Sequence, residues 1–177
     1  MVFTEFFDMV RSAHSEDLVD DLLDTVPSST GGAYTAVGTY DHAELVGYVA
    51  EYCKLTDTSV SDALFAFGHY LFGRFRAAYG GFFEGVNGSF EFLSRIEEVI
   101  HAEVLKLYPD AELPRFTVER HDGDYLILRY ESVRHLEDLA SGLIAGTIEY
   151  YQEEIQVSRE STGDGAERFV LRRVGAS

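Results

Sequence analysis

Apolar residues recur with a helical period through the first two thirds of the chain and with a period of two in the last third. The helical pattern predicts five helices, which cover about residues 2–13, 16–24, 42–53, 60–78 and 89–107. Asp41 with Glu44 and Ser59 with Asp62 have the spacing of capping boxes, so the third and fourth helices are expected to begin there. Ser89 is expected to cap the fifth.

From Pro114 onward the pattern predicts strands. Residues 116–118 and 125–131 are expected to pair as a hairpin, and 155–157 and 168–171 to form two closing strands around the glycine-rich turn at 163–165, after a helix over 135–151. This order of elements predicts a single α+β domain over 1–177. It has a mainly helical N-terminal part and a C-terminal antiparallel four-stranded sheet with a packed helix.

Composition fits one globular domain, with 177 residues of which 46% are hydrophobic. The net charge of −17 disfavours nucleic acid and anionic membranes as partners. This excess of acidic residues either keeps the protein soluble or matches a protein partner with a basic surface. No apolar run of about 18 residues occurs, so no membrane span is expected. The first residues lack the features of a signal peptide, and the single Cys53 suits a reducing cytoplasm.

Two groups of residues have the chemistry of a binding site. His101 lies at the flank of the apolar stripe of its helix, where a neutral imidazole is suited to bind a metal or to serve in the core. Tyr130, Ser132 and Arg134 alternate along a strand, so they are expected to point to one side and to bind a carboxylate, unless they are an ordinary strand end. A metal ligand together with a carboxylate clamp suggests haem, with iron for the imidazole and propionates for the clamp.

Other patterns stay ambiguous or point away from catalysis. Gly142 and Gly146 give the following helix a small face, which permits close approach of a flat ligand or of another helix. The acidic pairs Glu97-Glu98 and Glu153-Glu154 are interpreted as solvated faces. No zinc-binding spacing, phosphate-binding loop or nucleophile motif occurs, so the chain is not expected to be an enzyme.

Three motifs together resemble the H-NOX family, the haem nitric oxide/oxygen binding domain related to the sensor domain of soluble guanylate cyclase. They are Ile-His-Ala-Glu-Val-Leu-Lys-Leu-Tyr-Pro-Asp-Ala-Glu-Leu-Pro at 100–114, Tyr-Glu-Ser-Val-Arg at 130–134 and Gly-Leu-Ile-Ala-Gly at 142–146. The segments 31–40 and 67–72 are also similar to family segments. The resemblance covers nearly the whole chain.

The resemblance implies haem b (iron protoporphyrin IX) as cofactor, held between the helical part and the sheet. It assigns His101 as the proximal iron ligand and Tyr130, Ser132 and Arg134 as the holders of the propionates. Pro114 matches the family proline that presses on the porphyrin. A helical subdomain over about 1–60 and a haem-anchoring subdomain over about 61–177 follow from the same resemblance.

The distal side of the haem decides which gas binds. In oxygen-binding members a tyrosine donates a hydrogen bond to O₂, and the matching position here is Leu139. The other expected distal residues also lack donors; they are Phe6, Leu71, Phe72, Phe75 and Leu143. The expectation is therefore binding of NO and CO, with little or no stable binding of O₂.

The resemblance also implies an output. NO is expected to weaken the bond between iron and His101, and the helical part then moves against the sheet. Because no effector sequence follows residue 177, the expected target acts in trans, as a histidine kinase or as a diguanylate cyclase or phosphodiesterase. Two other functions are weighed: a haem-dependent enzyme of NO or peroxide chemistry, and a haem-free interaction domain of the same fold.

Overall fold

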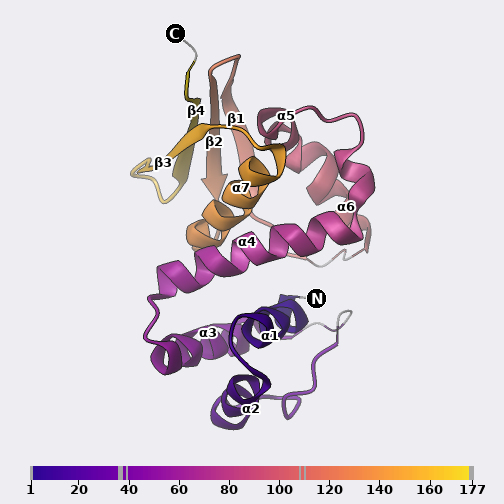
Figure 1. Ribbon diagram of the computed structural model, residues 1–177, viewed down its shortest axis with the longest axis vertical. Helices are drawn as coiled ribbons and strands as arrows, with labels where there is room; N and C mark the ends of the chain where they lie inside the picture. The colour runs from indigo at the N-terminus through magenta and orange to yellow at the C-terminus, as the bar shows by residue number, and fades with distance from the viewer. Residues whose placement is uncertain (1, 36–37, 39, 108, 110, 176–177) are drawn as a thin grey trace.

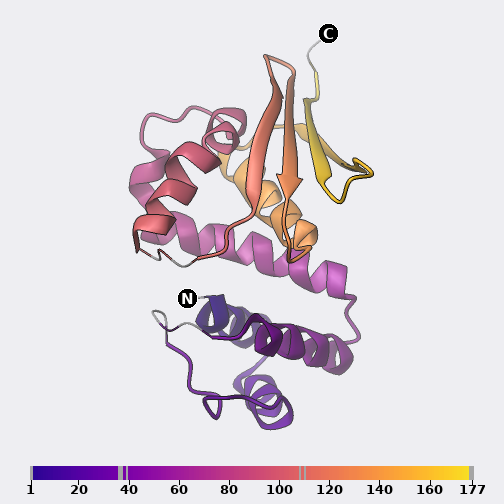
Figure 2. The same cartoon turned by 180° about the vertical axis from the view of Figure 1, so that it is seen from behind.

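Helix α4 (Val60–Ala78) separates the structure into two groups of elements (Figure 1). Helices α1, α2 and α3 lie on one side of it, and the sheet with the remaining helices lies on the other, as the view from behind also shows (Figure 2). This computed structural model describes residues 2–35, 38, 40–107, 109 and 111–175. Parts of the segments 31–40 and 100–114 that resemble H-NOX proteins lie outside the described residues.

The order of elements is that of an α+β fold, as predicted. The helices are α1 (Val2–Ala13), α2 (Glu16–Thr25), α3 (His42–Thr56), α4, η1 (Gly80–Phe83), α5 (Ser89–Ser94), η2 (Ile96–His101), α6 (Ala102–Leu107) and α7 (Glu137–Tyr151). The strands are β1 (Arg115–His121), β2 (Tyr125–Glu131), β3 (Ile155–Ser161) and β4 (Glu167–Arg173).

The predicted caps of α3 and α4 are present. Asp41 accepts a hydrogen bond from the backbone of Ala43 at 2.9 Å, and Ser59 accepts one from the backbone of Asp62 at 3.0 Å. These bonds satisfy amide groups that have no partner within the helix. Glu44 does not complete a capping box, because its carboxylate instead accepts from the backbone of Ser29 at 3.2 Å.

Close helix packing explains the small face of α7. A Cβ atom added at Gly142 would lie 2.0 Å from the carbonyl oxygen of Phe65, and one added at Gly68 would lie 2.1 Å from the carbonyl oxygen of Leu139. Glycines on both helices therefore let the backbones of α4 and α7 meet directly. Of the two interpretations left open by the sequence, this one accounts for Gly142.

The sheet has the strand order β1-β2-β4-β3, and every neighbouring pair is antiparallel. Leu126, Leu128 and Tyr130 alternate along β2 and are buried, as the period of two requires. They pack with residues of α7 in a C-terminal cluster that also includes Phe169. The N-terminal cluster, around Phe6 and Tyr48, is separate, and α4 contributes to both clusters.

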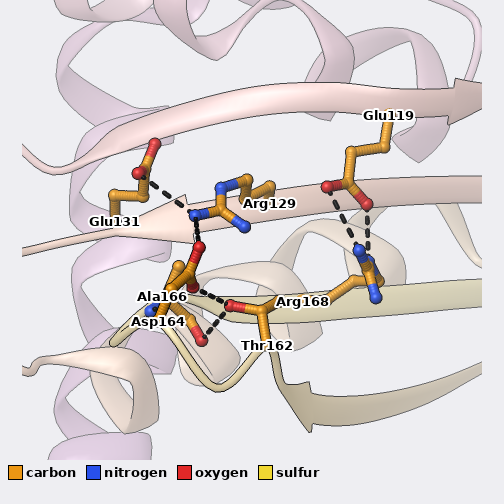
Figure 3. A network of polar contacts seen from close by, with 7 residues as sticks. All are labelled: Glu119, Arg129, Glu131, Thr162, Asp164, Ala166 and Arg168. Carbon is orange, nitrogen blue, oxygen red and sulfur yellow. Dashed lines mark hydrogen bonds and ion pairs between the residues drawn. The ribbon is translucent and has the colours of Figure 1, made fainter.

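The other face of the sheet carries a network of charges (Figure 3). Arg129 and Arg168 are directly opposite each other on β2 and β4, an arrangement that is unfavourable by itself. Each is paired with an acid: Arg129 with Asp164 at 2.7 Å, and Arg168 with Glu119 at 2.5 Å. Glu119 lies at a bulge of β1, between Val118 and Arg120.

This network predicts a dependence of stability on pH. Hydrogen bonds from Thr162 and Arg129 hold the pKa of Asp164 well below its usual value of 3.8. Because the folded-state pKa is depressed, the stabilisation is present above the usual pKa and is lost as the pH falls below it. We expect Asp164→Asn to lower the unfolding temperature at neutral pH and to reduce its fall below about pH 4. Thermal unfolding monitored by circular dichroism across pH measures this, and parallel profiles for both proteins would contradict it.

The helix that carries His101 differs from the single helix predicted over 89–107. It consists of α5, the π-helical η2 and α6 in succession. Ser89 does not cap it: Gly88 holds that position, and the backbone amide of Ser89 donates to Glu153 at 2.7 Å. The partner comes from 64 residues away, so local spacing gave no signal for it. Wide π turns are often found at functional positions of helices.

The helices of the structure were compared with the requirements for crossing a membrane. In the part of the chain that it describes, no helix combines the length and the apolar character that a membrane crossing requires.

Candidate functional site

His101 is the last residue of η2, and its side chain is only 14% exposed. Its Nδ1 atom lies 3.0 Å from Oε1 of Glu97, one turn earlier in the same helix. The same carboxylate oxygen accepts a hydrogen bond from the backbone amide of Phe116 at 2.7 Å. The imidazole is thus attached through Glu97 to the second residue of β1.

Aromatic rings continue from His101 into the core of the sheet. The centroid of the Phe116 ring lies 6.0 Å from that of His101 and 5.1 Å from that of Tyr130. Tyr130 is 3% exposed, and this burial raises the pKa of its hydroxyl, while a hydrogen bond from Ser132 opposes the rise. The Tyr130 hydroxyl therefore stays protonated and can donate a hydrogen bond at neutral pH.

Ser132 and Arg134 follow the end of β2 and line an open cavity of about 400 Å³. The Ser132 hydroxyl accepts a hydrogen bond from the Arg134 backbone at 3.2 Å. The Arg134 guanidinium donates to the exposed carboxylate of Glu112 at 2.7 Å. Pro114 lies between Leu113 and Arg115, which line the same cavity. The arginine thus already binds a carboxylate, the group that a propionate offers.

The predicted distal residues are divided between the two hydrophobic clusters. Phe72, Phe75 and Leu143 belong to or pack against the C-terminal cluster, which Ile96 and Ile100 of the His101 segment also contact. Phe6, Leu71 and Leu139 belong to or pack against the N-terminal cluster. Phe6 is fully buried there among the rings of Phe7, Tyr52 and Phe67. The assignment of all six to one haem wall stays a prediction.

Helix α7 carries two hydroxyl groups that are hydrogen-bonded within the helix itself, whereas the buried hydroxyl of Tyr151, at its C-terminal end, has no partner among the described residues. The hydroxyl of Thr147 donates to the carbonyl of Leu143 at 2.8 Å, and that of Ser141 donates to the carbonyl of Glu137 at 2.9 Å. Both hydroxyls are therefore satisfied within their own helix.

The chemistry of these residues fits a haem. An iron porphyrin needs one imidazole nitrogen, and Nε2 of His101 has no hydrogen bond to a described residue. It also needs cationic and hydroxyl groups for its two carboxylates, and Arg134, Ser132 and Tyr130 supply them within five residues of sequence. In the described part of the chain, no three His, Cys, Asp or Glu side chains gather to hold a free metal ion.

Two acids that the sequence pattern placed on solvated faces hold backbone groups in the structure. Glu97 and Glu153 are not simple solvated faces, because each accepts hydrogen bonds from backbone amides distant in sequence. For Glu97 a local signal was available, since a residue four positions before a helical histidine lies on the same face. For Glu153 no such signal exists.

Comparison with known proteins identifies the family and the fold. Residues 1–159 match the family model described as haem-NO-binding. The ferrous, unliganded H-NOX protein of K. algicida is 30% identical and superposes with a TM-score of 0.90, covering 98% of this chain and 95% of that one.

Two further structures are similar. The H-NOX protein of Shewanella woodyi, solved with IWP-051 in the Fe(II)CO state, is 33% identical with a TM-score of 0.86, over 100% and 96% of the two chains. That of S. oneidensis in the Fe(II)NO state is 25% identical with a TM-score of 0.89, over 98% of each chain. Among curated proteins none matches.

The family match over most of the chain and the shared fold give one conclusion. This chain belongs to the H-NOX family, the haem-binding domains of gas sensors.

Proposed function

We propose that this protein is a sensor that binds NO and CO at a ferrous haem b ligated by His101. The observation that carries the proposal is the imidazole of His101, which is mostly buried, attached through Nδ1 to Glu97, and without a described hydrogen-bond partner at Nε2. The related structures with CO and NO support the choice of gases. When bound, haem iron supplies the coordination site for the gas.

The chain's own residues then have separate tasks. His101 holds the iron, while Arg134, Ser132 and Tyr130 bind the propionates and fix the orientation of the haem. Pro114 would press on the porphyrin. Leu139, Leu143, Phe6, Leu71, Phe72 and Phe75 exclude water and offer no hydrogen bond to the gas, which disfavours O₂.

Signalling follows from the release of His101. With haem bound, His101 would hold the iron until NO weakened that bond, and its release would let the N-terminal helices move relative to the sheet. The connection that transmits this motion is α4, because it contributes to both hydrophobic clusters. The altered surface acts in trans on a cytoplasmic partner enzyme, a histidine kinase or a diguanylate cyclase or phosphodiesterase.

Absorption spectra of the reduced protein test the choice of gas. We expect the Soret band of the ferrous form to shift on addition of NO or CO and to show no stable oxygen complex in air, because the proposed distal residues are all leucine or phenylalanine and their side chains carry no hydrogen-bond donor. Substrate turnover with peroxide or with NO and O₂ measures the enzyme alternative. A stable oxygen complex in air would refute the assignment of Leu139 and its neighbours as a distal wall without donors.

A further inference from the structure

Glu97 joins the expected iron ligand to the sheet through a single carboxylate oxygen. We propose that Glu97 is a positioning residue that orients His101 and strengthens its bond to iron. This inference rests on the proposed function, since it assigns a role relative to haem bound at His101. It is carried by two contacts of Oε1: 3.0 Å to Nδ1 of His101 and 2.7 Å to the backbone amide of Phe116.

The first contact fixes the tautomer of the imidazole. An ionised carboxylate only accepts hydrogen bonds, so the shared hydrogen must be on Nδ1 of His101. The lone pair of the neutral ring is then on Nε2, the nitrogen left free for iron. A carboxylate that accepts the Nδ1 hydrogen also makes Nε2 a more basic ligand. The same effect is known in metal sites where a histidine ligand donates its other N–H to a carboxylate.

The second contact fixes the carboxylate itself. A glutamate side chain that is 38% exposed would otherwise sample several rotamers, and the amide of Phe116 restricts it. The ring of Phe116 also packs near the imidazole, at 6.0 Å between centroids. The orientation of His101 is therefore set from its own helix and from β1 together.

This arrangement has a consequence for signalling. A more basic imidazole binds iron more strongly, so a gas that breaks this bond must overcome a larger free energy. The carboxylate also couples η2 to β1, which means that movement of His101 away from iron acts on the start of the sheet. Glu97 is thus expected to set how readily the sensor responds.

The test compares Glu97→Gln with Glu98→Gln in the haem-loaded protein. Glutamine keeps the size of the side chain and an oxygen that can accept from the amide of Phe116. It removes the negative charge that lies beside the imidazole. Glu98 is exposed, and among the described residues the hydrogen bond and ion pair of His101 are made with Glu97 and not with Glu98, so Glu98→Gln removes the same charge one residue away. Resonance Raman spectra of the ferrous, unliganded protein report the stretching frequency between iron and histidine.

We expect this frequency to fall in Glu97→Gln and to be unchanged in Glu98→Gln. Haem affinity, measured by transfer to an acceptor protein, should fall about tenfold in Glu97→Gln alone. An unchanged frequency and affinity in Glu97→Gln would overturn the positioning role. Absence of the iron–histidine vibration in the wild-type protein would instead overturn the proposed function, and this inference with it.

A second measurement needs no variant. In the ferrous, CO-bound wild-type protein, NMR detects the Nδ1 proton of His101 and its exchange with water. We expect a slowly exchanging proton, because it is held by Glu97 inside the protein. The inference would be overturned if this Nδ1 proton exchanged rapidly or were missing while CO was bound and the other proton signals of the His101 ring were present. This outcome is decisive even if Glu97→Gln fails to retain haem.

Discussion

Replacing His101 with glycine is expected to abolish stable haem binding, with a loss of haem affinity of more than about 100-fold. Loss of a residue that only hydrogen-bonds to a metal ligand costs about 10–100-fold in affinity, and loss of the ligand itself should cost more. Added imidazole should enter the vacated space and restore the ferrous Soret band. The restored haem would lack a covalent link to η2, so NO should no longer change the structure of the protein. Haem titration followed by hydrogen exchange with and without NO measures both effects.

His69→Gly is the matched control for this experiment. His69 also lies on a helix, its side chain is 44% exposed, and its partner is Glu149 at 2.7 Å. Both variants lose a similar, small amount of helix propensity, about 0.5 kcal/mol or less, because histidine is already a weaker helix former than alanine. We expect His69→Gly to retain haem and the response to NO. Normal haem affinity in His101→Gly without imidazole would show that another residue ligates the iron.

Replacing Gly142 with alanine is expected to lower the free energy of unfolding by about 1–3 kcal/mol, the usual cost of overpacking, or by more if the helices cannot separate. The new Cβ would lie 2.0 Å from the carbonyl oxygen of Phe65 and 2.8 Å from the backbone nitrogen of His69. Neither is the end of a flexible side chain, so α7 must move away from α4. Urea unfolding of the haem-loaded protein measures the loss.

Gly73→Ala provides the opposite control on α4. A Cβ added at Gly73 would meet nothing within 4 Å, and the position lies in the interior of the helix. Alanine should therefore raise the free energy of unfolding by about 0.5–1 kcal/mol through helix propensity alone. If Gly142→Ala were as stable as Gly73→Ala, the direct contact of the α4 and α7 backbones would be refuted.

Most of the fold could be predicted because its signals are local. The period of apolar residues predicted α4 at 60–78 and β2 at 125–131, and both have these bounds in the structure. Caps at Asp41 and Ser59 depend on contacts within three residues, so their spacing was sufficient. The division of the helix at 89–107 was not predicted, because it contains no glycine or proline to mark the π turn.

The family resemblance depended on short motifs, and the comparisons confirmed it. The motifs include His101, Tyr130, Ser132 and Arg134 but say nothing of what holds these residues in place. That support comes from residues such as Phe116, whose amide reaches back 19 positions to Glu97. Contacts at such separation leave no periodic pattern in a single sequence.

By itself the sequence determined the class of fold, the order of its elements and the family, because helical and strand periods, caps and short motifs are all local. Only the tertiary structure decided that glycines of α4 and α7 bring two backbones into contact, and that Glu97 faces both an imidazole and a strand. These contacts depend on which surfaces of the chain pack together when it folds. Side chains of the same type and spacing can be exposed to solvent in one fold and can contact a neighbouring backbone in another.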